Sequence, residues 1–565
     1  MSRLDLTKKP FCLSSTQIKW VEDTIASMTE DEKAEQLFCP LSYSNDPGYL
    51  TYVLGAHRWG GVMFRSNPAK EVQAAINTLQ ANSSIPLIIS ANLEDGGSGI
   101  ASEGTYMGRQ MLMAATGETE QARRLGRICG VEGAAVGVNV TYAPIVDIDM
   151  NFMNPITNVR TYGSDPDVVL NMGKAYMEGL SGTGVAPTIK HFPGDGVDTR
   201  DQHLLTSVNS LSLEQWENTY GKVYRGLIEE GAPIVMAGHI AMPAMEEFYD
   251  KKPCTQVIPG SFSANILRYL REELHFNGLI STDASPMVGM MAVTNRREAV
   301  PLAIEHGCDM YLFTKDLEED LRFMKEGIAS GLLSRQRLHE ALERILALKA
   351  MMGLPEKKAD GTLLKKEEEL SVLANAEHQL WASECADKGV TLVKDVRNLL
   401  PISPEKGKRV LLEILGDFPS NDRVYAHFER RLTEAGFEVT KYIPETFETI
   451  FLDGAVEQFK AKYDLVFYIG NIENASNKTT ARINWHTLFG AGNNLPWFAK
   501  EVPTVFVSVG NPYHLYDVPM VPTYVNAYCH APAVIDAAID KVLGKGEFKG
   551  VSPIDPFCGC WDTRL

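Results

Sequence analysis

The sequence of 565 residues lacks the long apolar runs that a membrane-spanning helix requires. Its first residues, MSRLDLTKKPFCLSS, have no apolar stretch after the basic side chains, so they are not typical of a secretory signal. The nine cysteines are scattered from Cys12 to Cys560 without a C-x-x-C pair, as in proteins that keep their thiols reduced. These features predict a cytoplasmic protein with no membrane association and no structural metal site.

The chain also has fewer positively charged than negatively charged side chains. The chain has 54 Lys and Arg against 72 Asp and Glu, for a formal net charge of −18. Such a surface repels polyanions on average, so neither nucleic acid nor an anionic membrane is expected as a partner. A Walker-type phosphate loop is absent, and GDG at 194–196 is too short for a dinucleotide fingerprint. We therefore expect no cofactor, and the sequence gives no indication of an oligomeric state.

Apolar segments of strand length alternate with helical segments over the first two-thirds of the chain. Amphipathic stretches such as 213–230 and 262–274 separate the strands. Near-continuous apolar strands between helices predict an α/β fold with a parallel sheet. Seven strands, or eight, within about 310 residues favour a (β/α)₈ barrel over an open sheet. The seven predicted strands are 60–64, 86–91, 138–144, 186–191, 233–239, 278–283 and 309–313.

The remainder of the chain is predicted to form a second domain. A helix at 334–353, with Ser334 and Gly353 as its caps, ends the catalytic barrel assigned to residues 1–353. Residues 354–372 are charged and weakly periodic, which predicts an interdomain linker. The β–α alternation then restarts. Five or six strands and a helix at 422–435 predict an open three-layer α/β/α sandwich, an accessory domain over residues 373–565.

Polar side chains follow the predicted barrel strands where each strand ends. In a barrel of this type the working residues lie at the C-terminal ends of the strands, so these side chains should converge on one pocket. Asp283 closes an apolar strand and precedes two small residues, which makes it the candidate nucleophile; capping the next helix is the alternative. Asp147 is a further strand-end carboxylate. The candidate substrate-binding residues at strand ends are Asn92, Glu94, Lys190, His191 and His239.

The stretch KHFPGDGVDTRDQH, which ends at His203, concentrates groups that can move protons. Asp201 and His203 are two residues apart, so in an extended segment their side chains project to the same side and the carboxylate can orient the imidazole. The alternative for Asp201 and His203 is a solvated pair of loop side chains. The alternative for Lys190 and His191 is a salt bridge at the strand end beside a structural histidine. A zinc site is not expected here, because Lys190 and Arg200 would compete with the metal.

This stretch resembles the K-H-F-P-G-x-G-x₄-D-x-H signature of glycoside hydrolase family 3, in its β-N-acetylglucosaminidase branch. The similarity covers the whole barrel, about residues 15–353, and GVTLVKD and VSVGNPY resemble the family's accessory α/β sandwich. Four further segments are similar to the same family in the same order: MTEDEKAEQLF (28–38), APIVDIDMNFMNPITNVRTYGSDP (143–166), PIVMAGHI (233–240) and FNGLISTDASPM (276–287).

The resemblance implies an exo-acting, retaining β-N-acetylglucosaminidase that releases terminal sugars from cell-wall fragments or chitooligosaccharides. Asp283 would form a glycosyl-enzyme, and His203, oriented by Asp201, would protonate the departing oxygen and then activate water. After it gives up its proton a histidine is neutral, and it therefore also tolerates phosphate as the acceptor. Gly194 and Gly196 are expected to let this loop move over the bound sugar.

The same comparison of residues implies that Arg160, Lys190 and His191 hold hydroxyls of the terminal sugar. Asn92 stands where the family usually has an aspartate that binds these hydroxyls, which predicts a shifted sugar preference. Gln202, in place of the usual serine between the dyad residues, is expected to point away and to matter little. The alternative functions are a β-N-acetylglucosaminide phosphorylase, a non-catalytic sugar-binding protein and a β-glucosidase of the same fold.

Overall fold

The computed structural model describes residues 4–443, 455–485, 487–488, 491–492 and 494–565. The chain divides into two compact units. The first unit comprises the residues up to Tyr106 together with 122–157 and 165–378, and the second comprises 107–121, 158–164 and 379–565. Two short segments inside the first unit's sequence therefore belong to the second unit.

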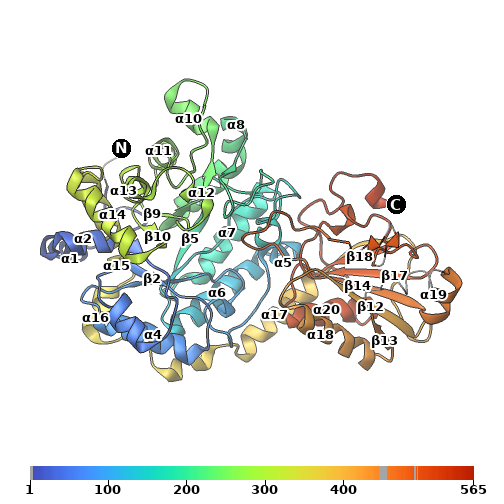
Figure 1. The fold of residues 1–565 in the computed structure, drawn as a ribbon. Coiled ribbons are helices and arrows are strands. Elements are labelled where there is room, and N and C mark those ends of the chain that lie inside the picture. The colour runs from blue at the N-terminus through green and yellow to red at the C-terminus, as the bar shows by residue number, and fades with distance from the viewer. Residues whose placement is uncertain (1–3, 444–454, 486, 489–490, 493) are drawn as a thin grey trace. The chain divides into compact units, whose positions relative to one another are not determined.

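A curled parallel sheet forms the centre of the first unit (Figure 1). A separate parallel pair, β1 (Phe38–Cys39) with β10 (Tyr311–Leu312), is linked to the two sheet edges by the bridges Leu41–Met63 and Ser281–Met310. All seven predicted strands are present, which confirms the parallel α/β prediction. Within the described residues the six strands of the sheet are, in spatial order, β2 (Gly61–Met63), β3 (Ile88–Ala91), β4 (Val140–Thr141), β5 (Ala186–Phe192), β7 (Ile234–Ala237) and β9 (Leu279–Thr282).

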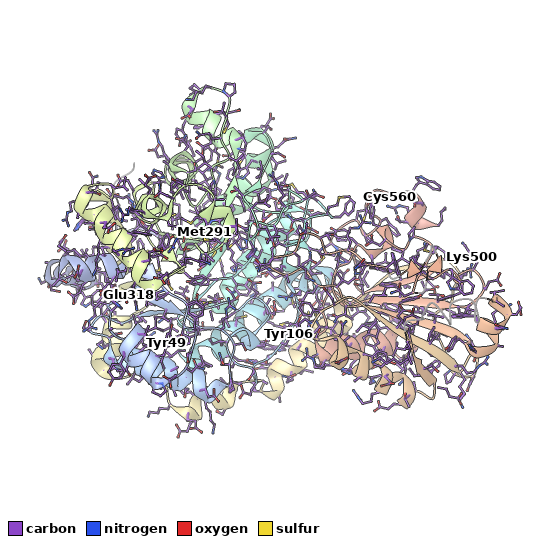
Figure 2. All side chains as sticks on the ribbon, in the orientation of Figure 1. Tyr49, Tyr106, Met291, Glu318, Lys500 and Cys560 are labelled. Carbon is purple, nitrogen blue, oxygen red and sulfur yellow. The ribbon has the colours of Figure 1, made fainter. Side chains whose placement is uncertain are left out.

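Helices flank these strands, and side chains fill the space between the two (Figures 1 and 2). Strand residues such as Val62, Val235 and Ile280 are fully buried, which explains the near-continuous apolar runs in the sequence. The main helices of this unit are α1 (Ser15–Ser27), α2 (Glu30–Gln36), α4 (Ala69–Asn82), α6 (Thr119–Val136), α7 (Pro166–Leu180), α9 (Lys222–Glu230), α10 (Pro243–Asp250), α11 (Ala264–Glu272), α13 (Arg296–Glu305), α14 (Leu317–Ser330) and α15 (Arg335–Met351).

Short elements complete the strand-end loops of the first unit. The amphipathic stretch 213–230 forms α8 (Leu213–Trp216), one π-helical turn (Glu217–Gly221) and α9. A small parallel pair, β6 (Ser207–Val208) with β8 (Ile240–Ala241), and the one-turn helix α12 (Val288–Met291) lie after β5, β7 and β9 in the chain. As predicted, Ser334 caps α15, because its side chain accepts a hydrogen bond from the Arg337 N–H.

The segment 354–372 differs from its prediction as a linker. It contains α16 (Leu354–Asp360) and a 3₁₀ turn (Glu367–Val372), and it belongs to the first unit. Side chains of α4 hold its backbone: Asn77 Nδ2 donates to the Lys365 carbonyl (2.7 Å) and Gln73 Nε2 donates to the Lys366 carbonyl (3.0 Å). The acceptors of these hydrogen bonds are main-chain carbonyls, which every residue has. The contact therefore cannot be predicted from the pattern of apolar side chains in the sequence.

The second unit is built on an open sheet with β11 antiparallel at one edge. Tyr468, Phe498 and Phe506 stack in its core. Five or six strands were predicted, and the sheet has six among the described residues, which confirms a second α/β unit. In spatial order they are β11 (Thr391–Asp395), β18 (Thr523–Asn526), β17 (Thr504–Ser508), β14 (Leu465–Gly470), β12 (Arg409–Leu415) and β13 (Glu438–Lys441), with α17 (Ala376–Gly389), α18 (Asn421–Glu434), α19 (Val456–Lys462) and α20 (Pro532–Val542) as the main helices.

Neither a membrane-spanning helix nor a metal-binding cluster is found in the described part of the chain. None of its helices is long and apolar enough to cross a membrane. Nor do three or more His, Cys, Asp or Glu side chains in that part gather in a way that could hold a metal ion.

Candidate active site

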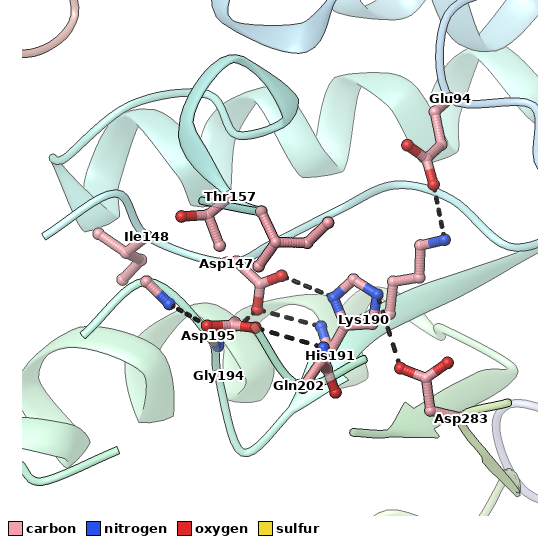
Figure 3. A network of polar contacts seen from close by, with 12 residues as sticks. Glu94, Asp147, Ile148, Thr157, Lys190, His191, Gly194, Asp195, Gln202 and Asp283 are labelled. Carbon is pink, nitrogen blue, oxygen red and sulfur yellow. Dashed lines mark hydrogen bonds and ion pairs between the residues drawn. The ribbon is translucent and has the colours of Figure 1, made fainter. Parts of the chain in front are cut away.

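The C-terminal ends of the first unit's strands bring together side chains that are far apart in the sequence (Figure 3). Lys190 and His191 lie on β5, Asp283 directly follows β9, and Glu94 follows β3. Parallel strands end at one edge of a sheet, so these positions share a single neighbourhood. The predicted convergence of Glu94, Asp147, Lys190, His191 and Asp283 is present in the structure.

Asp283 is a mostly buried carboxylate, with 12% of its side chain exposed. One oxygen accepts a hydrogen bond from the Ala284 N–H (2.7 Å), and the other lies 4.0 Å from His191 Nε2. Burial would raise the pKa of Asp283, but the interaction with His191, followed by weaker contributions that include the Ala284 N–H, outweighs it and holds the pKa below its usual range. Asp283 is therefore ionised at neutral pH, as a carboxylate nucleophile must be.

His203 and Asp201 form the predicted pair. His203 Nδ1 lies 2.6 Å from Asp201 Oδ1, which also accepts the backbone N–H of His203 (2.9 Å). Since an ionised carboxylate only accepts hydrogen bonds, Nδ1 carries a proton and Nε2 is the nitrogen left for proton exchange. The Asp201 side chain is buried, whereas 20% of the His203 side chain is exposed. The contact suits an oriented acid/base histidine, and that role stays a prediction.

His191 is oriented in turn by Asp147. Asp147 Oδ2 lies 2.7 Å from His191 Nδ1, and Oδ1 accepts the N–H groups of His191 (3.1 Å) and Asp195 (2.8 Å). Asp195 is itself buried beside this carboxylate. Burial, followed by the negative charge of Asp147, raises the pKa of Asp195 to about 8. Asp195 therefore keeps its proton at neutral pH. No role was predicted for Asp195 from the sequence, because a buried, protonated carboxyl has no sequence signature.

The Asp195 proton predicts how the stability of the fold depends on pH. An unfolded aspartate titrates near 3.8, so the folded chain binds the Asp195 proton more tightly. The stabilisation is fully present below pH 3.8 and is lost as the pH rises through about 8. In the Asp195→Asn variant, which mimics the neutral carboxyl, Tm should fall less between pH 5 and pH 8 than in the wild type, as differential scanning calorimetry can measure. Equal falls in the two proteins would show that Asp195 holds no such proton.

His239 does not fit its expected role as a sugar contact. It is fully buried, and both ring nitrogens are engaged: Nε2 with the Ala284 carbonyl (2.9 Å) and Nδ1 with the Ser261 hydroxyl (2.6 Å). A carbonyl only accepts, so Nε2 carries the proton, and burial lowers the pKa of His239 so that Nδ1 accepts from Ser261. The geometry instead makes His239 a residue that fixes the carbonyl of Ala284, the residue after Asp283.

The remaining predicted sugar ligands are placed as follows. Lys190 Nζ donates to Glu94 Oε1 (2.8 Å), and both side chains are buried. An ammonium has three donors, so Lys190 can also reach a sugar hydroxyl. Asn92 is exposed at the end of β3. Arg160 lies in a 3₁₀ turn (Asn158–Arg160) that belongs to the second unit, and its contact with the sugar stays a prediction.

Gly194 and Gly196 are required by the local packing, and the hinge role expected from the sequence stays a prediction. Both are buried and have positive φ angles, of 121° and 108°. A Cβ atom on Gly194 would lie 2.1 Å from the Tyr220 ring, and one on Gly196 would lie 1.9 Å from the Ile148 carbonyl. Glycine is thus required by close packing and by the left-handed backbone.

Comparison with known proteins gives one family model and several full-length relatives. The model described as "Glycosyl hydrolase family 3 N terminal domain" matches residues 29–348. The beta-N-acetylglucosaminidase/beta-glucosidase of Cellulomonas fimi is 44% identical over 577 residues, with both chains fully covered. The solved structure of beta-glucoside phosphorylase BglX bound to 2FGlc is 43% identical, has a TM-score of 0.93, and the match covers 98% of this chain and 99% of that one.

A more distant solved structure shares the fold. It is a glycoside hydrolase family 3 beta-N-acetylglucosaminidase from Paenibacillus sp. str. FPU-7, with 22% identity and a TM-score of 0.79. The match covers 94% of this chain and all of that one.

Proposed function

The chain belongs to glycoside hydrolase family 3, and we propose that it cleaves terminal β-linked glucose or N-acetylglucosamine in two steps, with phosphate as the final acceptor. One observation carries the proposal: the buried Asp283 carboxylate lies within electrostatic reach of His203, whose Nδ1 is fixed by Asp201. These are the two groups that a retaining glycosidase needs, with an imidazole in place of the second carboxylate.

In the first step Asp283 attacks the anomeric carbon as the bond to the leaving oxygen breaks. The electron pair of that bond goes to the oxygen, which takes the proton from His203 Nε2. An ester between the sugar and Asp283 results, with inverted configuration. His191 and Lys190, held by Asp147 and Glu94, would bind the sugar's hydroxyls while this happens.

The acceptor in the second step follows from the charge on His203. After the first step a carboxylate acid/base would be anionic and would repel phosphate, whereas imidazole is neutral. Phosphate can then attack the anomeric carbon and release Asp283 as a carboxylate. Two inversions leave a sugar 1-phosphate with the β configuration of the substrate. That BglX is a beta-glucoside phosphorylase supports this choice of acceptor over water.

A panel of nitrophenyl β-glycosides, assayed with and without millimolar phosphate, tests the proposal. We expect phosphate to accelerate turnover of the β-glucoside, the β-N-acetylglucosaminide or both, and ³¹P NMR to show β-sugar 1-phosphate as the main product. If free sugar remains the main product at millimolar phosphate, the enzyme is a hydrolase. The ratio of kcat/KM values for the two sugars shows whether the β-N-acetylglucosaminidase activity expected from the sequence is the principal one.

A further inference from the structure

Gln202 stands between Asp201 and His203 in the sequence, where its side chain was expected to point away and to matter little. In the structure this side chain is buried and hydrogen-bonded. Only 1% of it is exposed. Its Oε1 accepts the backbone N–H of His239 (2.7 Å), and its Nε2 donates to Asp195 Oδ2 (3.3 Å). Figure 3 shows Gln202 beside Asp195 and His191. One end of the amide is therefore bonded to Asp195, near the start of the same strand-end loop, and the other end is bonded to the backbone of His239, after β7.

Both partners of Gln202 are themselves fixed. Asp195 Oδ1 accepts the Gly196 N–H (2.7 Å) and Asn154 Nδ2 (3.0 Å), and its backbone carbonyl accepts the Tyr220 hydroxyl (2.6 Å). On the other side, His239 is bonded through its ring to Ser261 and to the Ala284 carbonyl. Gln202 thus connects its loop to the turn that follows His191 and to the strand end that adjoins Asp283.

The contacts between Asp201 and His203 cannot connect their loop to other parts of the site. Asp201 accepts both the backbone N–H and the ring Nδ1 of His203, and all of these atoms belong to one loop. They orient the imidazole relative to its own backbone and leave its distance from Asp283 unspecified. The loop has further anchors, at the His203 carbonyl, which accepts the Val288 N–H (3.1 Å), and at Thr206, whose hydroxyl donates to the Gly289 carbonyl (2.8 Å). Gln202 adds a buried anchor between the two dyad residues.

We propose that Gln202 is a positioning residue whose buried amide holds the loop so that His203 can transfer a proton above Asp283. The inference rests on the proposed acid/base role of His203. Displacement of a catalytic group by about 1 Å can cost on the order of 100-fold in rate, so the loss of this anchor should be visible in the step that needs the acid.

The variant Gln202→Met keeps the volume of the side chain and removes both hydrogen bonds. We expect kcat/KM for an alkyl β-glycoside, which requires protonation, to fall by about 10- to 100-fold. With the 2,4-dinitrophenyl glycoside of the same sugar, whose leaving group needs no acid, it should fall by less than about 3-fold. Added to His203→Ala, the same substitution should cost nothing further, because the group it positions is already gone.

Gln80 offers a matched control. It is 2% exposed, and its amide likewise bonds in both directions, to the backbone N–H and carbonyl of Leu87 (3.0 Å each). Gln80→Met should lower Tm and leave the ratio of the two substrates unchanged. If Gln202→Met does not fold, Gln202→Glu, which keeps the acceptor for the His239 N–H, allows the same comparison.

Equal losses on both substrates, or a loss that adds fully to that of His203→Ala, would overturn the proposal and leave Gln202 a purely structural residue. The result can be separated from a failure of the proposed function. If His203→Ala itself shows no dependence on the leaving group, the acid role fails and this proposal fails with it. If His203→Ala shows that dependence and Gln202→Met does not, only this proposal fails.

Discussion

Replacement of Asp283 by alanine should lower kcat for every β-glycoside by on the order of 10⁴-fold or more. The variant loses the atom that attacks the anomeric carbon, and none of the neighbouring groups can take its place: Asp147 is bound to His191, and Glu94 is bound to Lys190. The loss should be equally large for substrates with good and poor leaving groups, since both need the nucleophile. Steady-state kinetics with nitrophenyl and alkyl glycosides measure it.

Two controls separate this effect from unfolding. The Asp283 carboxylate accepts the Ala284 N–H, whereas the ladder between β9 and β7 is formed by backbone groups, so Tm should change little. Added azide should restore part of the activity of Asp283→Ala with an activated substrate, and the glycosyl azide should have inverted, α configuration. A β-azide, or residual activity above about 1% of the wild type, would show that another residue is the nucleophile.

Replacement of His203 by alanine should slow alkyl glycosides by roughly 10²- to 10⁴-fold, the usual contribution of a general acid. Dinitrophenyl glycosides should lose little in kcat/KM, because their leaving group departs without a proton. A plot of log kcat/KM against the pKa of the leaving group should therefore be much steeper for His203→Ala than for the wild type. The comparison isolates the step in which His203 acts.

Asp201→Asn is a graded control for His203. It keeps the shape of the pair but weakens the acceptor that faces Nδ1, at 2.6 Å in the wild type, so an intermediate slope is expected. Identical fractional losses of His203→Ala on alkyl and dinitrophenyl substrates would remove the acid role from His203. The site would then need a different proton donor.

The fold was largely predictable because parallel strands are buried on both faces and leave continuous apolar runs in the sequence. The runs that contain β3 and β9 are clear examples. Strand β1 was not among the seven predicted strands. It has only two residues and comes just after α2, so it is too short to show a periodic pattern in the sequence. The helical turns of residues 354–372 and their contact with α4 were not predicted either. Side-chain amides of α4 bind main-chain carbonyls there, and such bonds leave no pattern in the sequence.

From the sequence, a site residue could be predicted only where it follows a strand or belongs to the family signature. Asp283, Asp201 and His203 were predicted in this way; the contact between Asp201 and His203 is present in the structure, and the catalytic roles stay predictions. The residues that support them were not recognised. Gln202 was expected to matter little, and His239 was expected to touch the sugar, because a sequence does not show which hydrogen bonds a side chain has already made.

The most direct test of the account is to trap the covalent intermediate. A 2-deoxy-2-fluoro β-glycoside with a good leaving group should accumulate as a glycosyl-enzyme, because fluorine destabilises the oxocarbenium-like transition states of both steps. Peptide mass spectrometry should find the fluorosugar on Asp283, and phosphate should remove it faster than buffer alone. A label on another carboxylate such as Asp147, or no label in an enzyme that turns over natural glycosides, would contradict the account.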